Sequence, residues 1–183
     1  YPGYAASWGP RQPSWGHMPG IADYFGRMQW ILQSGTPQVD IAFLRQKGYA
    51  GSGFGAPWLS REGGRLGWTH RFISPGTLEL DTAFVRNGRL APDGPAFKVL
   101  IFEGDAFHGR KATMPLGTAQ RLVALAEAGL PVLVVGDWSS PVPSGLARKG
   151  ETARLCALFG RLLTLPTVRN GAARADIPAG LAA

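Results

Sequence analysis

KVLIFEGDAFHGRKATMPLGTAQRLVALAEAGLPVLVV, residues 98–135, is the stretch that decides the fold. Its two ends, 98–102 and 131–135, are short and almost wholly apolar, so each predicts a buried strand. Between them lies a segment whose apolar residues recur at helical spacing: Leu116, Ala119, Leu122, Val123 and Ala126. Two apolar strands joined by an amphipathic helix form a βαβ unit, in which the strands are parallel and the crossover is right-handed.

Other segments extend this pattern. Thr113 is the expected N-cap of the central helix, and Gly129 is its expected C-terminal stop. The further predictions are strands at 39–44 and 70–73, a helix or turn starting at Ser74-Pro75, a hairpin with an Asn-Gly turn at 83–90, and helices at 57–66 and 151–163. Strands that are apolar on both faces need cover from both sides. The predicted fold class is therefore α/β: an open, mainly parallel sheet with flanking helices, flavodoxin-like or amidotransferase-like in outline.

The two ends of the chain differ from this middle. Residues 1–19 are irregular and rich in aromatic residues, Pro and Gly, whereas 20–183 are expected to form the α/β domain. That domain begins with a helix over 20–34 that carries one apolar face and ends where Gly35 can adopt a left-handed cap. Asp176 and Pro178 resemble the opening of a helix that stops early, so we expect truncation at the C-terminus, with a natural terminus as the alternative.

Composition excludes several classes of protein. With 45% hydrophobic and 17% charged residues, the chain is not a disordered charged tail. The formal net charge is +7, but the arginines are scattered singly, so nucleic acid is not a favoured partner. The single cysteine, Cys156, lies in an apolar run and is expected to be buried and inert. No apolar run is long enough to cross a bilayer, and no signal peptide is visible, so no membrane partner is expected.

Candidate polar residues follow the two apolar strands. Asp105 comes shortly after the first strand and Asp137 after the second. If these strands are neighbours, the two carboxylates converge, and such a pair could serve acid/base chemistry or bind a cation or sugar hydroxyls. Trp138 and Phe107 are the only apparent walls of a pocket there. The alternative is that both aspartates satisfy amides of their own turns.

No other motif indicates a cofactor or a metal. The glycine-rich stretch 51–57 is not GxGxxG and precedes a poor helix, which argues against a phosphate-binding loop. The three histidines, His17, His70 and His108, have no ligand spacing. We therefore predict no metal and no cofactor. A separate sugar contact is possible in the N-terminal segment, where Trp8, Trp15 and His17 could stack on a pyranoside; the alternative is that they pack against protein.

Several blocks of sequence resemble the family 106 glycoside hydrolases, the α-L-rhamnosidase-like proteins. The block 18–46 is similar to the segment that leads out of that family's catalytic barrel, through Tyr24, Arg27, Gln33, Gly35 and the run Val39-Asp40-Ile41-Ala42. The blocks FISPGTLELDTAFVRNGRLAPDGPAFKVLIFEGD (72–105), MPLGTAQRLVALAEAGLPVLVVGD (114–137) and ADIPAGLAA (175–183) are similar to the segments that follow. These are motifs of the scaffold rather than of a catalytic site.

This resemblance implies a non-catalytic accessory or scaffold domain of a secreted or periplasmic bacterial glycoside hydrolase. Its partners would be the remainder of the parent polypeptide, namely a catalytic barrel and a β-sandwich, with carbohydrate as a possible ligand. The barrel that carries the family's catalytic carboxylates is absent here, so no catalytic residue is carried over and this chain alone is expected to be inactive. Two alternatives stay open: a stand-alone ligand-binding α/β module, and a small enzyme with a carboxylate site at Asp105 and Asp137.

Overall fold

The computed structural model describes residues 9–45, 69–103 and 112–171 and divides the chain into two compact units, Tyr1–Pro37 and Gln38–Ala183. The helix predicted at 20–34 therefore falls in the first unit, together with the aromatic segment. The elements in chain order are η1 (Pro13–His17), α1 (Met18–Gln33), β1 (Ile41–Leu44), β2 (His70–Ile73), η3 (Pro75–Glu79), β3 (Val85–Arg86), β4 (Arg89–Leu90), β5 (Val99–Glu103), β6 (Thr113–Met114), α2 (Leu116–Glu127), β7 (Val132–Val135), β8 (Val142–Pro143), α3 (Glu151–Leu162) and β9 (Val168–Gly171).

The first unit consists of the 3₁₀ turn η1 and the helix α1. The end of α1 differs from the prediction, because Gly35 is not among the residues with a left-handed backbone. Instead, the Ser34 hydroxyl donates a 2.6 Å hydrogen bond to the carbonyl of Trp30, and the Ser34 N–H donates to Ile31. A serine hydroxyl thus satisfies one of the carbonyls that a helix leaves unpaired at its end.

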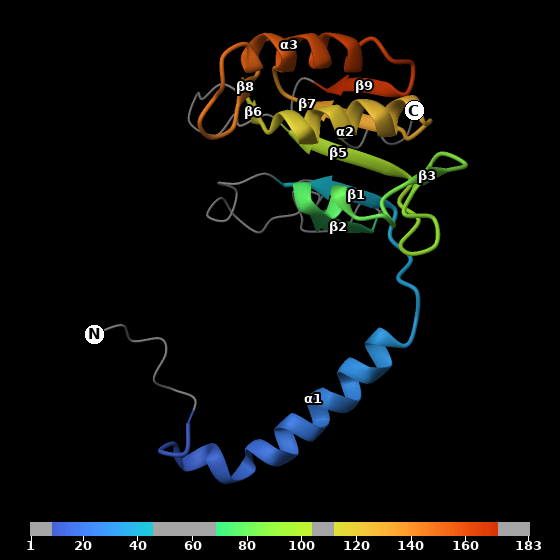
Figure 1. Cartoon of the computed structure of the whole chain (residues 1–183). Helices are drawn as coiled ribbons and strands as arrows, with labels where there is room; N and C mark the ends of the chain where they lie inside the picture. The colour runs from blue at the N-terminus through green and yellow to red at the C-terminus, as the bar shows by residue number, and fades with distance from the viewer. Residues whose placement is uncertain (1–8, 46–68, 104–111, 172–183) are drawn as a thin grey trace. The chain divides into compact units, whose positions relative to one another are not determined.

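The second unit is built on a five-stranded sheet with the order β2-β1-β5-β7-β9 (Figure 1). Every neighbouring pair is parallel, with register partners such as Phe43 and Ile101 between β1 and β5. Numbered in chain order, the strands run 2-1-3-4-5 across the sheet, which is the flavodoxin-like order. The predicted α/β class and the βαβ unit of β5, α2 and β7 are confirmed.

The sheet is apolar on both faces, as the strand sequences require. One face packs against α2, α3 and η3, and the core there includes Leu100 and Phe102 from β5, Leu122 from α2 and Phe159 from α3. The other face carries a second buried cluster, whose members are Ile41, Phe43, Ile101, Leu133 and Val135. All five are at most 3% exposed, so both faces of the sheet are withdrawn from water.

The boundaries of α2 are explained by its neighbours. Thr113 is not the N-cap, because it lies in β6, which pairs in parallel with β8; the N-cap is Pro115. The predicted stop at Gly129 is confirmed, since this glycine has φ of +97°, a conformation that only glycine adopts freely. Within the helix, Arg121 donates hydrogen bonds to the carbonyls of Leu78 and Ala83 and so ties α2 to η3 and the loop after it.

The turns between strands also follow the sequence. Asn87 and Gly88 both have positive φ, as a type I′ turn requires, so the predicted hairpin is confirmed as β3 and β4. At the start of η3, Ser74 and Thr77 form a reciprocal capping box. The helix predicted at 57–66 and the helix opening at Asp176 lie outside the described residues.

The amino ends of three strands are fastened by one aspartate. Asp40 precedes β1, and its carboxylate accepts hydrogen bonds from the backbone N–H and the hydroxyl of Thr69, next to β2. Lys98, next to β5, places its Nζ 2.7 Å from the same carboxylate. The hydrogen bond from Lys98 is the main cause of a lowered Asp40 pKa, followed in the same direction by the bonds from Thr69.

We predict that Asp40→Asn destabilises the α/β unit by about 1–2 kcal/mol at pH 7 and by much less at acid pH. Because the folded-state pKa lies below the ordinary value of 3.8, the ionised carboxylate contributes stability above that value. This contribution is lost as the pH falls through the folded-state pKa. Urea unfolding of both proteins between pH 2 and pH 7 measures the difference.

The matched control is Asp81→Asn, which changes an exposed aspartate outside the Asp40 cluster. It should alter the free energy of unfolding by less than about 0.5 kcal/mol at every pH. An Asp40→Asn variant whose deficit is the same at pH 2 and pH 7 would contradict the role of the ionised carboxylate.

Candidate functional site at the carboxyl edge of the sheet

Ligands of open α/β sheets bind beyond the carboxyl ends of the strands, where the strand order reverses. Here the order reverses between β1 and β5, because β2 lies on one side of β1 and the later strands lie on the other. The arrows of β1 and β5 in Figure 1 point to the same side of the sheet, which is the side of this candidate site. Arg45 follows β1 directly, and Glu103 is the last residue of β5.

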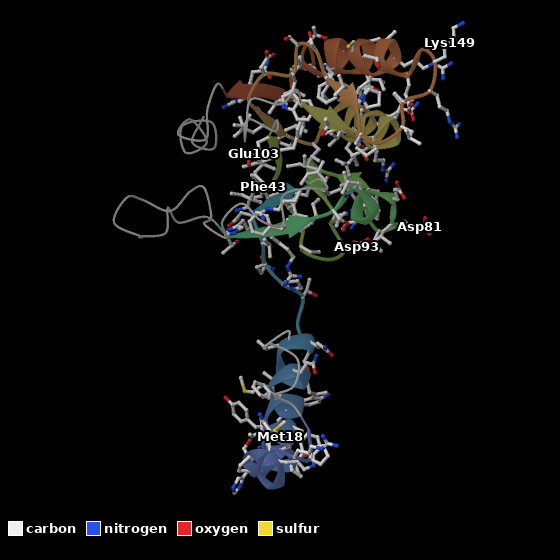
Figure 2. All side chains as sticks on the ribbon, turned by 90° about the vertical axis from the view of Figure 1, so that its left-hand side faces the viewer. Met18, Phe43, Asp81, Asp93, Glu103 and Lys149 are labelled. Carbon is white, nitrogen blue, oxygen red and sulfur yellow. The ribbon has the colours of Figure 1, made fainter. Side chains whose placement is uncertain are left out.

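Arg45 and Glu103 occupy neighbouring positions on the same face of the sheet. The β1–β5 register pairs Leu44 with Phe102, so the next step along both strands places Arg45 beside Glu103. Side chains alternate along a strand, and both residues therefore share the face of Phe43 and Ile101. In Figure 2, which is turned so that the side to which these arrows point faces the viewer, Glu103 and Phe43 are labelled.

The surroundings of these two residues are partly apolar. The Arg45 guanidinium carbon lies 3.8 Å from the centre of the Phe72 ring, a cation–π contact, and the Arg45 N–H donates to the Ile73 carbonyl. Glu103 is only 6% exposed, and together with Thr118 it is one of two buried polar residues in the described chain. The edge of the sheet thus carries a cation and an anion in register, a pattern suited to hydroxyl groups or to a paired ion.

Asp137 lies one strand away from this reversal point. Asp105 and Asp137 can converge only if the strands before them are neighbours, and β5 and β7 do pair, with Glu103 opposite Val135. Asp137 itself is exposed, and its Oδ1 accepts a 2.8 Å hydrogen bond from the Ser139 N–H. Asp105 lies outside the described residues, and the convergence of the two carboxylates stays a prediction.

The electrostatics of Asp137 are those of a turn residue. Hydrogen bonds from Ser139, first from its hydroxyl and then from its backbone N–H, lower the pKa of the Asp137 carboxyl. A general acid in glycoside hydrolysis needs the opposite, a carboxyl whose pKa is raised so that it stays protonated. Asp137 is therefore suited to capping its own turn or to holding a negative charge, and not to donating a proton.

Trp138 belongs to the core rather than to the wall of a pocket, so the expectation about its place is wrong. It is 3% exposed, its ring stacks on Phe159 at 4.6 Å between centroids, and it meets Phe102 edge to face. Its Nε1–H donates to the Val135 carbonyl at the end of β7. Burial of the indole places Trp138 in the core immediately after Asp137. Asp137 therefore lies at the surface, in a tight turn.

The N-terminal aromatic residues lie in the other unit. Trp15 and His17 are in η1 and both are exposed, while Trp8 lies outside the described residues. An exposed indole is available for stacking, so the role of Trp15 and His17 as sugar contacts stays a prediction. Cys156 is half-buried rather than fully buried, with its Sγ 3.7 Å from the Pro141 carbonyl.

Two further properties concern the described part of the chain. No cluster of three or more His, Cys, Asp or Glu side chains with metal-binding geometry is found among residues 9–45, 69–103 and 112–171. None of the helices in these ranges combines the length and the hydrophobicity that crossing a bilayer requires.

Arg45 and Glu103 are the residues that the sequence argument missed. The candidates predicted from the sequence lie in the loops beyond the strands, whereas these two residues lie at the ends of the strands themselves. A signal was present: each is a charged residue that terminates a run of apolar strand residues, IAFL before Arg45 and VLIF before Glu103. Only the strand order, however, places the two runs side by side.

Comparison with known proteins places the fold. No protein-family model and no curated protein matches this chain. Among solved structures, the rhamnosidase from Novosphingobium sp. PP1Y is similar, with a TM-score of 0.56 and 20% sequence identity. The match covers 94% of this chain and 16% of the rhamnosidase chain. At this level of identity the likeness concerns the fold: the chain shares an α/β architecture with one segment of a much longer protein.

We predict that Trp138→Ala destabilises the α/β unit by about 3–5 kcal/mol, because it removes a buried indole and its stacking contact with Phe159. Thermal or urea unfolding of the purified chain measures this. Trp15→Ala is the control, since that indole is 43% exposed and lies in the other unit. A loss below about 1 kcal/mol for Trp138→Ala would mean that the ring faces a pocket.

Proposed function

We propose that this chain is a non-catalytic accessory or scaffold domain of an α-L-rhamnosidase-like glycoside hydrolase. The observation that carries the proposal is the match of 94% of this chain to a segment that makes up 16% of a rhamnosidase. A domain that occupies a small part of a large polypeptide has the remaining domains as its natural partners. We expect these to include the catalytic barrel and the β-sandwich that the sequence resemblance implies.

The chemistry of the carboxyl edge supports a non-catalytic role. Glycoside hydrolysis requires two carboxyl groups across the scissile bond, one of them kept protonated. Asp137 has a lowered pKa and is engaged with Ser139, so it does not fit the protonated partner. Glu103, the other carboxylate that the structure describes at this edge, is 6% exposed at the end of the central strand, where direct contact with a polysaccharide is restricted.

A second candidate function is favoured by the charges at the strand reversal. Arg45 on the Phe72 ring and Glu103 beside it place a guanidinium group and a carboxyl group where flavodoxin-like sheets bind ligands. A small ligand with adjacent hydroxyl groups, such as a single sugar rather than a polysaccharide, has the chemistry that this pair of charges can hydrogen-bond. On this alternative the chain is a ligand-binding α/β module.

One set of assays separates these functions. We expect the purified chain to hydrolyse aryl α-L-rhamnosides and other aryl glycosides no faster than background, and the variants Asp105→Asn and Asp137→Asn to give the same result. Release of the chromophore is followed by absorbance. Turnover that disappears in either Asn variant would contradict the scaffold role and identify a catalytic carboxylate.

The same preparations test the ligand-binding alternative by calorimetry with L-rhamnose. A scaffold domain gives no saturable heat with this sugar. Saturable binding that Arg45→Ala abolishes and Arg86→Ala leaves intact would favour the second candidate, since Arg86 lies in the hairpin away from this edge.

A further inference from the structure

The helix α1 carries a broad apolar stripe. Residues at helical spacing along one side of it are all at least 38% exposed: Ile21, Tyr24, Phe25, Met28, Ile31 and Leu32. None of the helix residues is buried. Leu32 and Phe25 are among the most exposed, at 76% and 62%. Soluble proteins rarely leave so many large apolar side chains in water on one surface, so the stripe indicates an interaction site.

The sequence of α1 indicates a helix of low intrinsic stability. It has 16 residues, among them Pro19, Gly20 and Gly26. Two glycines each lower helix stability by about 1 kcal/mol relative to alanine, and helices of this length are marginal in water even with better sequences. The main stabilisation of such a helix comes from packing its apolar side, and for α1 that side is the stripe.

The width and charge of the stripe indicate what covers it. Its residues occupy three positions in every seven, which is the pattern of a helix on a domain core rather than the two in seven of a coiled-coil pair. Asp23 and Arg27 are the only charged residues in α1. A surface with so few charges is typical of a permanent interface rather than of a transient one.

The structural match indicates where the partner of the stripe comes from. It leaves about 6% of this chain outside, or roughly 11 residues, which is fewer than the 16 residues of α1. At least part of α1 thus has a counterpart in the rhamnosidase, within a segment that is 16% of that chain. The matched stretch therefore reaches into α1, and most of the longer protein lies outside that segment.

We infer that the α1 stripe docks permanently on an apolar surface of an adjoining domain of the same polypeptide. This rests on the proposed function in so far as it requires a larger parent chain. It assigns the linking helix a role of its own: α1 attaches the α/β unit to its neighbour. The occupant is a domain surface in the same chain, not a second copy and not a soluble ligand.

Amide hydrogen exchange tests this directly, in the 183-residue chain at low concentration and in the full polypeptide encoded by the same gene. The amides of α1 should exchange at least about 100-fold more slowly in the full polypeptide, because docking adds a free energy of opening. In the 183-residue chain they should exchange rapidly, while the amides of β5 and β7 stay protected in both.

Variants locate the contact. Phe25→Glu places a charge in the centre of the stripe and should abolish most of the added protection in the full polypeptide. Ala22→Glu is the matched control: it adds the same charge to the same helix outside the stripe and should leave the protection unchanged. Retained protection in β5 and β7 shows that the variants are folded.

Several outcomes would overturn the inference. Protection of α1 in a monomeric 183-residue chain would mean that its own α/β unit covers the stripe, and protection that rises with concentration would mean a second copy. Rapid exchange of α1 in the full polypeptide, or a reading frame confined to these 183 residues, would remove the adjoining domain. Because exchange is read without any activity assay, a parent chain that lacks glycosidase activity would disprove the proposed function and leave this test intact.

Discussion

The parallel pairing of β5 with β1 on one side and β7 on the other is the constraint on which the α/β unit depends. A parallel sheet needs crossover connections, and its faces must both be covered. The central strand VLIF satisfies this with Leu100 and Phe102 on one face and Ile101 on the other, all fully buried. The helix α2 is then the crossover that brings β7 back beside β5, and Trp138 locks the exit from β7 against Phe159 and Phe102.

Much of this arrangement could be predicted from the sequence because it rests on local patterns. Short apolar runs separated by an amphipathic helix specify a βαβ unit, and the Asn87-Gly88 dipeptide specifies the turn of the hairpin formed by β3 and β4. The helix caps were harder, since they depend on tertiary contacts. Thr113 has the chemistry of an N-cap but pairs with β8 instead, and Ser34 ends α1 in place of Gly35.

The candidate site was less predictable for a similar reason. Residues following β5 and β7 were identified from position along the chain, but the reversal point of the sheet is set by the placement of β2 outside β1. The sequence of residues 70–73 does not specify on which side of β1 this strand pairs. The burial of Trp138 was also hidden, because a tryptophan after an aspartate in a loop has the same sequence whether it lines a pocket or fills a core.

Together these features describe an α/β unit with a buried core and a helix, α1, with an exposed apolar side. The α/β unit has a sheet covered on both faces and amino ends fastened by Asp40, as a rigid scaffold requires. Its one described loop carboxylate at the carboxyl edge, Asp137, is used in a turn. The apolar stripe of α1, by contrast, consists of exposed side chains. This combination supports the proposed role as a structural part of a larger polypeptide.

The most direct measurement of the central claim is the turnover of an aryl α-L-rhamnoside by the full polypeptide encoded by the gene, with and without the substitution Asp137→Asn. If the chain is an accessory domain of a rhamnosidase-like enzyme, the full polypeptide hydrolyses the substrate, and the substitution changes kcat by less than about twofold. A full polypeptide without glycosidase activity, or a loss of about 1,000-fold or more in kcat on replacing Asp137, would contradict the account.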